Sequence, residues 1–391
     1  MRRVSRSSLR NRRQLGVDSA LATAVLVRLM QGVRATGAED HVDAKFENYQ
    51  EEHNRIHVGT ASALFAKVIS ETLSVKGEFV YDTISGATPT GGPPPAGSDQ
   101  VPLTQMEETR YAGNAEMGIH FGQNTLTPQV AYSYESDYAS LGLSLNYGLE
   151  LNEKNTTLNL GFAQNFDTVY PATSPYLYQN EYKSTSSGIV GLTQLLSPQT
   201  VLSVSFTLGY ASGYLDDPYR GVKFDDYPVP DALFPEKRPG NRFNQVGYVS
   251  LTQFIKPLNA SVEATYRLYH DSWEIWSQTV GLSWFQKVGK YVVVNPFGRF
   301  YTQNAASFYG VSFPGDPSLS QIGIPDYYSA DYRLSALRTW SYGIKVIGRL
   351  FERISLDAQY MRYDMQGTDG VTSASAYPVA NVISVGASVW F

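Results

Sequence analysis

The sequence predicts an all-β protein, a transmembrane antiparallel β-barrel of about 16 strands with long extracellular loops and short periplasmic turns. From about residue 41 onward, apolar and polar residues alternate with a period of two, which is typical of strands and not of helices. The connections between these segments alternate between a short set and a set that includes every long loop. The chain holds 28 Tyr and 18 Phe, yet no apolar run after its N-terminus is long enough for a membrane-spanning helix.

The alternation is clearest in residues 139–151, where every second residue from Leu141 to Leu151 is leucine or tyrosine. The residues between them are Gly, Ser, Asn and Glu. Residues 201–211 and 353–360 repeat the pattern. A soluble β-sandwich also alternates, but its apolar face needs a second sheet. Small polar residues on the other face favour a water-filled lumen, so we assign the apolar face to lipid.

Sixteen alternating segments can be counted. We expect strands near 41–52, 57–70, 73–82, 110–121, 125–134, 138–151, 156–167, 181–196, 200–214, 242–255, 259–270, 273–288, 291–304, 329–350, 353–366 and 377–391. The long connections are 83–109, 168–180, 215–241, 305–328 and 367–376. Sixteen strands place every long loop on one side of the membrane and both termini on the other, as outer-membrane barrels require.

The first 38 residues differ from the rest in charge. They hold eight arginines and a single acid, Asp18. A basic stretch to Arg13 precedes an apolar stretch at 20–27 and small residues at 35–38, which is the order of a secretory signal peptide. We expect cleavage after Gly37 or Ala38, leaving 39–391 as the barrel; a basic amphipathic helix is the alternative. Cleavage makes the net charge more negative than −5, which argues against nucleic acid as a partner.

The chain offers little for catalysis or cofactor binding. It has no cysteine, which excludes disulfides, thiolate metal sites and covalent haem attachment, and we expect no cofactor. The G-x-S-x-G motif of a serine hydrolase is absent. His120 should lie mid-strand beside Glu116, where a structural or pore-lining role is favoured over that of a base. His53 and His57 lack a third metal ligand nearby. We therefore expect no enzyme activity.

The last residues carry an assembly signal. Val385, Ala387, Val389 and Phe391 form one apolar face that ends on a terminal aromatic residue. This pattern resembles the C-terminal strand signal that the barrel-assembly machinery of Gram-negative bacteria reads. We expect Phe391 to face lipid at the periplasmic rim, with that machinery and outer-membrane lipid as partners.

Several other segments resemble one uncharacterised bacterial family. They are 82–89 (DTISGATP), 213–220 (GYLDDPYR), 238–239 (RP) with 241–242 (NR), 270–273 (HDSW) and 300–309 (FYTQNAASFY). The family is a domain of unknown function whose members are regarded as outer-membrane barrels. The resemblance implies the barrel and its location but no settled activity. Its members' genes commonly lie near flavin-transferase and thioredoxin-like genes.

Strand parity predicts which charged residues face the lumen. The predicted pore-lining residues are Lys45, Glu47, Lys76, Glu78, Glu116, His120, Glu263, Arg267, Arg299, Lys345, Arg349, Arg353 and Asp357. Mixed charges at these positions would set ion preference in an open pore. The alternative, which we favour, is that they pair across the lumen and brace the barrel, or hold a plug.

Two long loops suggest further roles. The loop 215–241 carries the clustered carboxylates Asp216, Asp217, Asp225, Asp226 and Asp231. Such a cluster could bind calcium, but no D-x-D-x-D-G run is present, so an acidic solvated loop is the favoured interpretation. The first long loop contains Gly91-Gly92-Pro93-Pro94-Pro95 within 88–99 and could fold inward as a constriction.

The sequence thus leads to two hypotheses of different classes. The first is a porin-like channel that passes small polar solutes through the outer membrane. The second is a structural sheath or docking barrel for a partner lipoprotein or redox protein, suggested by the family's gene neighbours. A channel conducts alone in planar lipid, whereas a sheath needs its partner.

Overall fold

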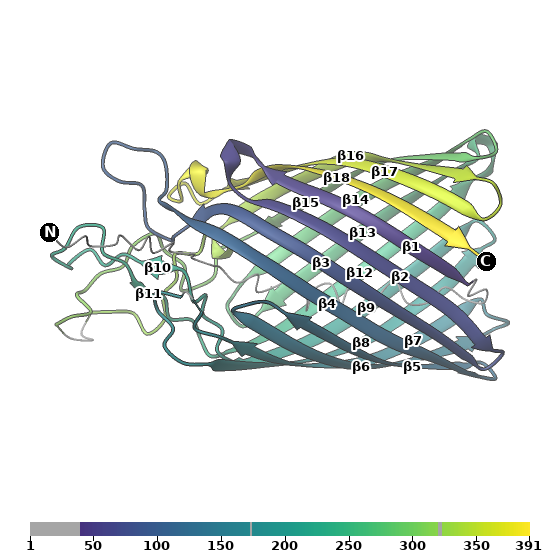
Figure 1. Ribbon diagram of the computed structural model, residues 1–391, viewed down its shortest axis with the longest axis horizontal. Coiled ribbons are helices and arrows are strands. Elements are labelled where there is room, and N and C mark those ends of the chain that lie inside the picture. Colours follow the sequence, from purple (N-terminus) through teal and green to yellow (C-terminus); the bar gives the residue numbers. More distant parts are fainter. Residues whose placement is uncertain (1–39, 173, 320–322) are drawn as a thin grey trace, which may run out of the picture.

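The computed structural model describes residues 40–172, 174–319 and 323–391. In this part of the chain, sixteen antiparallel strands close into one barrel (Figure 1). The closed barrel confirms the predicted fold class and strand number. The predicted signal peptide, residues 1–38, lies outside the described residues.

The barrel strands follow the chain around the wall. They are β1 (His41–Glu51), β2 (His57–Ser70), β3 (Leu73–Pro89), β4 (Leu103–Phe121), β5 (Asn124–Tyr134), β6 (Tyr138–Leu151), β7 (Thr156–Val169), β8 (Glu181–Ser197), β9 (Thr200–Gly213), β12 (Asn241–Ile255), β13 (Ala260–Asp271), β14 (Trp276–Val288), β15 (Val292–Gln303), β16 (Leu337–Leu350), β17 (Ile354–Gly367) and β18 (Val379–Trp390). A separate two-stranded sheet pairs β10 (Gly221–Val222) with β11 (Phe234–Pro235).

Four short 3-10 helices complete the structure. They are η1 (Glu52–Asn54), η2 (Lys256–Leu258), η3 (Tyr332–Leu334) and η4 (Ala374–Ala376). No helix in the described residues has the length and apolar character needed to cross a bilayer.

The first and last strands close the wall. β1 pairs with β18 in an unbroken register from His41 opposite Trp390 to Glu51 opposite Ala380. Closure leaves no free strand edge, so the backbone hydrogen bonds of the wall are satisfied within the sheet.

The two ends of the barrel differ, and we call them the turn end and the loop end. The turn end carries the short turns and the last residue, Phe391, at the right of Figure 1. The loop end carries every long connection, together with β10 and β11. This sorting is the one that the alternating connection lengths predict.

Four strand boundaries at the loop end differ from the prediction by three residues or more. β3 and β4 continue to Pro89 and from Leu103, beyond the predicted 82 and 110. Their outward residues there, such as Thr83 and Ser85, are polar, so the apolar alternation that marks a strand in lipid is lost. β16 begins at Leu337 and β14 at Trp276, later than the predicted 329 and 273, because the preceding residues fold into the loops.

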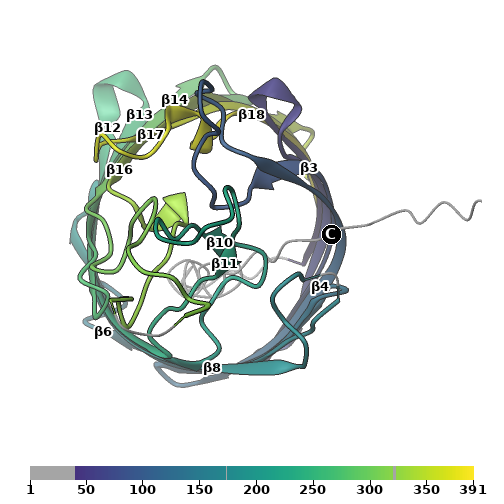
Figure 2. The same cartoon turned by 90° about the vertical axis from the view of Figure 1, so that its left-hand side faces the viewer.

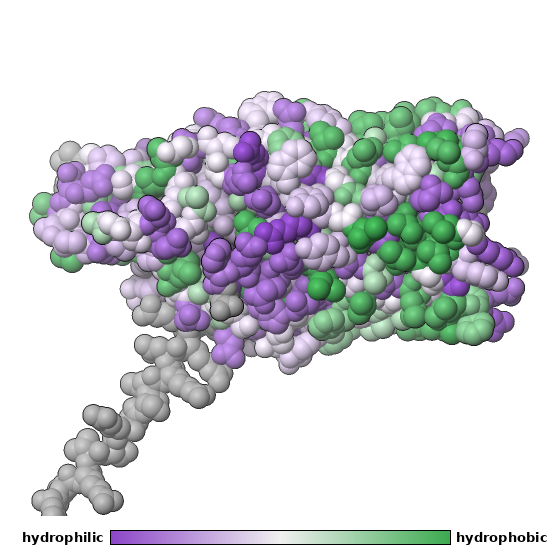
Figure 3. All heavy atoms as spheres, turned by 90° about the horizontal axis from the view of Figure 1, so that it is seen from above, coloured by the Kyte–Doolittle hydropathy of each residue, from purple (hydrophilic) through white to green (hydrophobic). Residues whose placement is uncertain are grey.

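The outer surface carries the apolar residues of the alternation. Leu143, Phe162 and Phe206 are about half exposed, and their chain neighbours Ser144 and Ser205 point to the opposite face. Figure 3 shows hydrophobic residues gathered toward the turn end of the face in view, with hydrophilic residues toward the loop end. The apolar band therefore covers only part of the barrel's length on that face.

Deleting Phe391 should slow assembly without loosening the finished barrel. Its side chain is 62% exposed, beyond the last residue of β18, and its ring centroid lies 5.3 Å from Lys67 Nζ. The register between β1 and β18 ends at Trp390, so deletion removes only the terminal hydrogen bond from Phe391 N–H to Asp40 O at 3.0 Å. We expect periplasmic aggregates in membrane fractionation, and an unchanged melting temperature for the protein that does assemble. A normal yield of the deletion variant would contradict the role of Phe391 as an assembly signal.

Candidate functional site

Two loops fold together over the mouth of the barrel at its loop end. They are residues 214–240, between β9 and β12, and residues 304–336, between β15 and β16. We call their described parts the cap. Figure 2 looks onto the loop end and shows β10 and β11 lying across the mouth.

The cap has an apolar core of its own. Val222 and Phe224 from the first loop are almost fully buried and cluster with Phe313 and Ala330 from the second. The ring of Phe224 also meets Tyr328 edge to face, with centroids 5.1 Å apart. Burial of aromatic side chains is a main source of stability in such small units. The cap is therefore a packed structure and not a pair of solvated loops.

The chain enters the cap through a glycine. Gly213, the last residue of β9, has φ +109°, a conformation that favours glycine. A Cβ atom there would lie 2.2 Å from the carbonyl oxygen of Tyr182. The backbone N–H of Gly213 donates to Gly240 O at 3.0 Å, which closes the base of the first cap loop.

Tyr219 attaches the cap to a distant part of the wall. Its ring clusters with Ile84 of β3 and Met106 of β4. Its hydroxyl donates to Asp137 Oδ2 at 2.8 Å, in the connection between β5 and β6. On the shorter way round the closed barrel, four strands (β8, β7, β6 and β5) separate β9 from β4, so this loop crosses the mouth.

The first long connection, between β3 and β4, also contacts the cap. The N–H of Gly221 donates to Thr90 O at 2.9 Å. Gly91, at φ +94°, lies so close that a Cβ atom there would be 2.3 Å from Gly221 O. The glycine-rich loop that the sequence suggested as a constriction therefore meets β10 at the mouth.

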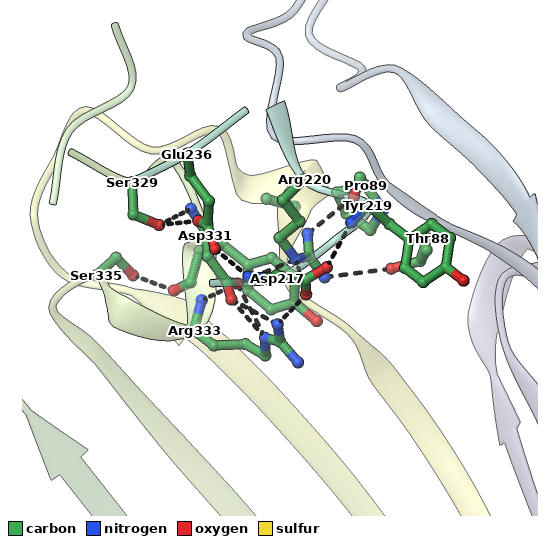
Figure 4. A network of polar contacts seen from close by, with 12 residues as sticks. Thr88, Pro89, Asp217, Tyr219, Arg220, Glu236, Ser329, Asp331, Arg333 and Ser335 are labelled. Carbon is green, nitrogen blue, oxygen red and sulfur yellow. Dashed lines mark hydrogen bonds and ion pairs between the residues drawn. The ribbon is translucent and has the colours of Figure 1, made fainter. Parts of the chain in front are cut away.

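Six charged side chains gather inside the cap, and we call them the charge cluster. They are Asp217, Arg220, Glu236, Arg238, Asp331 and Arg333. Five of them have side chains no more than 7% exposed, and Arg333 is 35% exposed. Three arginines balance three carboxylates. Figure 4 shows the five labelled members of the cluster, all but Arg238, converging from both cap loops, with Arg220 reaching toward Pro89 and Thr88 of β3.

Asp331 lies at the centre of the charge cluster. Its carboxylate accepts hydrogen bonds from Arg238 at 3.0 Å and Arg333 at 2.5 Å, and it lies 3.4 Å from Arg220 Nε. It also caps η3 by accepting from the backbone N–H of Arg333. One side chain therefore joins all three arginines and orders the backbone around them.

The other two carboxylates connect the cap loops to each other. Asp217 pairs with Arg333 Nη2 at 2.7 Å. Glu236 pairs with Arg238 at 2.6 Å and accepts from the hydroxyl of Ser329 at 2.5 Å. Buried charges are tolerated only when they are paired and hydrogen-bonded in this way. The charge cluster therefore fixes the register of the two loops.

The surroundings shift the pKa values of two of the carboxylates in opposite directions. Burial opposes ionisation of Asp331, but Arg220, Arg333 and Arg238 together hold its pKa well below the usual range. Burial raises the pKa of Glu236 to about 7, because Arg238 offsets it only in part and Asp217 and Asp331 add negative charge. Glu236 is thus the group of the charge cluster that changes its protonation near neutral pH.

A second buried acid lies beside the attachment point of Tyr219. Glu135 is 2% exposed, in the connection between β5 and β6. Burial raises its pKa to about 8, and Asp137 and Glu108 add to this effect while Arg110 opposes it. Lower pH therefore favours the buried, neutral form of both Glu135 and Glu236.

The described structure gives no support to calcium binding, which was the less favoured alternative for the first cap loop. Asp217 belongs to the charge cluster, and Asp216 accepts from the backbone N–H of Arg238 at 2.6 Å. Asp225 and Asp226 accept from residues 312 and 315 of the second loop. No group of His, Cys, Asp or Glu in the described ranges could hold a metal ion. The interpretation as an acidic solvated loop fits Asp225, Asp226 and Asp231, which are exposed, but not Asp217, which is buried and paired with arginines.

The predicted pore-lining residues form pairs along the wall. Three ion pairs are Lys45–Glu47 at 2.8 Å, Lys76–Glu116 at 3.1 Å and Lys345–Asp357 at 3.0 Å. Each joins residues of the same strand or of neighbouring strands. The expectation that such charges pair across the lumen is wrong for these six residues, because a paired neighbour on the wall already satisfies each charge.

The remaining predicted residues are placed as follows. Glu78 accepts from Asn114 at 3.1 Å, Glu263 from Ser250 at 3.0 Å, and His120 lies within hydrogen-bonding distance of Ser74 and Thr125. Arg267 and Arg299 form no ion pair with a described residue, and Arg349 is exposed near the turn end. Arg353 was assigned wrongly, because β17 begins at Ile354 and Arg353 lies in the exposed turn before it.

The sequence prediction missed most of the charge cluster. Of its six members only Asp217 was singled out, and for calcium. A signal was nevertheless present, because the segments resembling the family contribute to this end of the molecule. Segment 213–220 supplies Asp217 and Arg220, 238–239 supplies Arg238, and 82–89 supplies the wall at Ile84. These segments share a location, the loop end of the barrel, and that shared location was the signal for the cap.

Residues 19–101 and 96–378 match the model of a family described as "Protein of unknown function (DUF3570)". The chain belongs to the DUF3570 family. The match covers nearly all of the barrel and the whole of the cap, so the charge cluster lies within the region that defines DUF3570. No curated protein matches the sequence.

Solved structures with a similar fold are outer-membrane proteins. OmpT of Vibrio cholerae is 9% identical, covers 92% of this chain and 100% of its own, and has a TM-score of 0.47. A bacterial polysaccharide outer membrane secretin is 6% identical, with 91% and 99% covered and a TM-score of 0.48. The siderophore receptor PirA from Pseudomonas aeruginosa is 10% identical, with 90% of this chain and 64% of the receptor covered and a TM-score of 0.43. The chain therefore spans about two thirds of that receptor. Similarity this low carries no argument about the activity of a DUF3570 protein.

Proposed function

We propose that this DUF3570 protein is an outer-membrane diffusion channel for small polar solutes, with an outer mouth narrowed by the cap. The observation that carries the proposal is the pairing of the lumen charges. Lys45–Glu47, Lys76–Glu116 and Lys345–Asp357 all pair along the wall, so none of these three pairs bridges the lumen. Charged side chains that pair with neighbours on the wall line the lumen and do not extend across it.

The orientation follows from the two ends of the barrel. In outer-membrane barrels the short turns face the periplasm and the long loops face outward. The cap would then lie on the outside of the cell, where solutes arrive. Solutes would pass beside or through the cap before they enter the lumen.

Conductance in planar lipid bilayers tests the proposal directly. We expect stepwise currents from the purified, refolded barrel without any added protein, and swelling of proteoliposomes in small sugars. Heat-modifiable migration on gels serves as the control that the barrel has folded. A folded barrel that neither conducts nor admits sugars would overturn the channel, and a docking barrel for a lipoprotein or redox partner would then be the better hypothesis.

Conductance should also depend on pH. Because burial raises the pKa of Glu236 to about 7, the folded cap binds a proton that the unfolded cap releases. Cap stability is therefore greatest below the unfolded pKa and falls as pH rises through the folded one. We expect conductance to rise, and hydrogen-exchange protection of the cap to fall, between about pH 4.5 and 7.

A variant identifies the group responsible. Glu236→Gln should reduce this pH dependence, and the double variant with Glu135→Gln should remove most of it, since burial raises both pKa values. Asp331 does not contribute in this range, because its pKa is held well below the usual value. An unchanged pH profile in the double variant would contradict the assignment.

A further inference from the structure

Two arginines on the lumen face lack the ion-pair partners that three lysines of the same face have. Arg267 lies on β13 and Arg299 on β15, and neither forms an ion pair or hydrogen bond with any residue in the described ranges. By contrast, Lys45, Lys76 and Lys345 each pair with a carboxylate at about 3 Å. The guanidinium donors of the two arginines are therefore left to water or to a ligand.

The strand register brings these two arginines to one part of the wall. Arg267 lies opposite Thr279 of β14, and Thr279 lies opposite Tyr301 of β15. Arg299 is two residues from Tyr301 on the same strand and the same face. Neighbouring strands are about 4.8 Å apart, so one strand separates two side chains that are each long enough to converge on one ligand.

Two tyrosines lie two residues from the arginines on the same strands, and their hydroxyls bond to residues other than the arginines. The ring of Tyr269 lies 5.8 Å from Arg267 Cζ, and its hydroxyl donates to Asp271 at 2.6 Å. The hydroxyl of Tyr301 donates to Gln303. Both phenols are thus committed to partners nearer the loop end. The ring of Tyr269 restricts the side chain of Arg267 while its charged end stays available.

The arginines lie just beneath the cap. Tyr301 packs against the apolar cluster of Leu337 and Tyr377 at the loop end, and Tyr269 packs against the cluster of Trp273 and Phe308. A solute that passes the cap would meet the two positive charges first. Lumen walls of low dielectric strengthen the attraction of such charges for anions.

We propose that Arg267 and Arg299 form an oxyanion-binding site that selects small solutes bearing a carboxylate or a phosphate. The planar guanidinium group matches both anions by two parallel hydrogen bonds, and two such groups side by side can hold one anion from both sides. The nearest carboxylates along β13 are already engaged, Glu263 with Ser250 and Asp271 with Arg242. This inference rests on the proposed channel function and specifies its solute.

Selectivity and block measurements test the site in the full barrel. In a potassium chloride gradient the wild-type channel should prefer chloride, and added inorganic phosphate or succinate should reduce the chloride current. In the double variant Arg267→Gln with Arg299→Gln, the half-blocking concentration should rise about tenfold, and the preference for chloride should fall. Block by phosphate alone or by succinate alone would support the site and identify its ligand.

A matched control removes the same kind of charge outside the lumen. Arg338 on β16 shares the outward face with Trp340 and donates to Gln366 at 2.9 Å, so Arg338→Gln should leave block and selectivity unchanged. If the wild type does not conduct, the channel itself is overturned. If wild type and double variant conduct with equal block and equal selectivity, only the oxyanion site is overturned. Heat-modifiable migration confirms that each variant has folded.

Discussion

Replacing Asp331 by asparagine should release the cap and raise the conductance. The substitution keeps the size of the side chain but removes the negative charge that joins Arg220, Arg238 and Arg333. Loss of one partner from a buried ion network costs about 3–5 kcal/mol, which is comparable to the stability of a small folded unit. We expect residues 214–240 to become sensitive to protease and the channel current to increase.

The barrel itself should survive this change. The strand ladder does not depend on Asp331, so heat-modifiable migration and membrane insertion should stay normal. Asp316→Asn provides the matched control, because among the described residues the carboxylate of Asp316 hydrogen-bonds to Ser318 in the same loop and to no arginine. Equal protease protection and equal current in Asp331→Asn and wild type would show that the charge cluster does not hold the cap in place.

Arginine substitutions on the two faces of the wall should have opposite consequences. Leu143 and Phe206 are about half exposed on the outer surface and lie beside Val130 and Val190 of the neighbouring strands. Leu143→Arg and Phe206→Arg should each cost about 2–4 kcal/mol, because a charge would enter the middle of the lipid layer. The measurement is the denaturant midpoint of the refolded barrel in lipid vesicles.

Matched controls lie one residue away in each strand. Ser144 and Ser205 point to the lumen, where an arginine remains in water, so Ser144→Arg and Ser205→Arg should fold nearly as the wild type does. In an open channel they should also shift ion preference toward anions. Equal damage from both pairs of substitutions would indicate a sheet buried on both faces and would contradict a lipid-facing wall.

The strands could be predicted because lipid imposes one strict rule on them. Wherever the outer face contacts lipid, every second residue is apolar, and a slip of one residue would exchange the two faces. The rule stops at the end of the apolar band. Beyond Tyr81 the outward residues of β3 are polar, so its continuation to Pro89 leaves no pattern in the sequence. Residues 329–336 show the opposite error: they were predicted to begin β16, but they fold into the loop and η3 before Leu337.

The cap could not be predicted, because its contacts are not periodic and join distant segments. Asp217 and Arg333 are 116 residues apart, and Tyr219 and Asp137 are 82 apart. The aspartates of the first loop were visible in the sequence, but the arginines that neutralise them were not recognisable as partners. The predicted lumen residues lie between these cases: strand parity could be read from the sequence, whereas the partners of Lys76 and Lys345 required the register.

The long-range contacts of the cap also have a consequence for the order of folding. Arg220 contacts Pro89 across 131 residues, and Arg333 contacts Asp217 across 116. Forming either contact in the unfolded chain would therefore cost a large loop-closure entropy. Only when the wall has brought β3, β9 and β16 to their places does the entropy of closing these loops become small. We therefore expect the cap to be the last part of the molecule to become ordered, so that protease protection of the cap would mark a completed barrel.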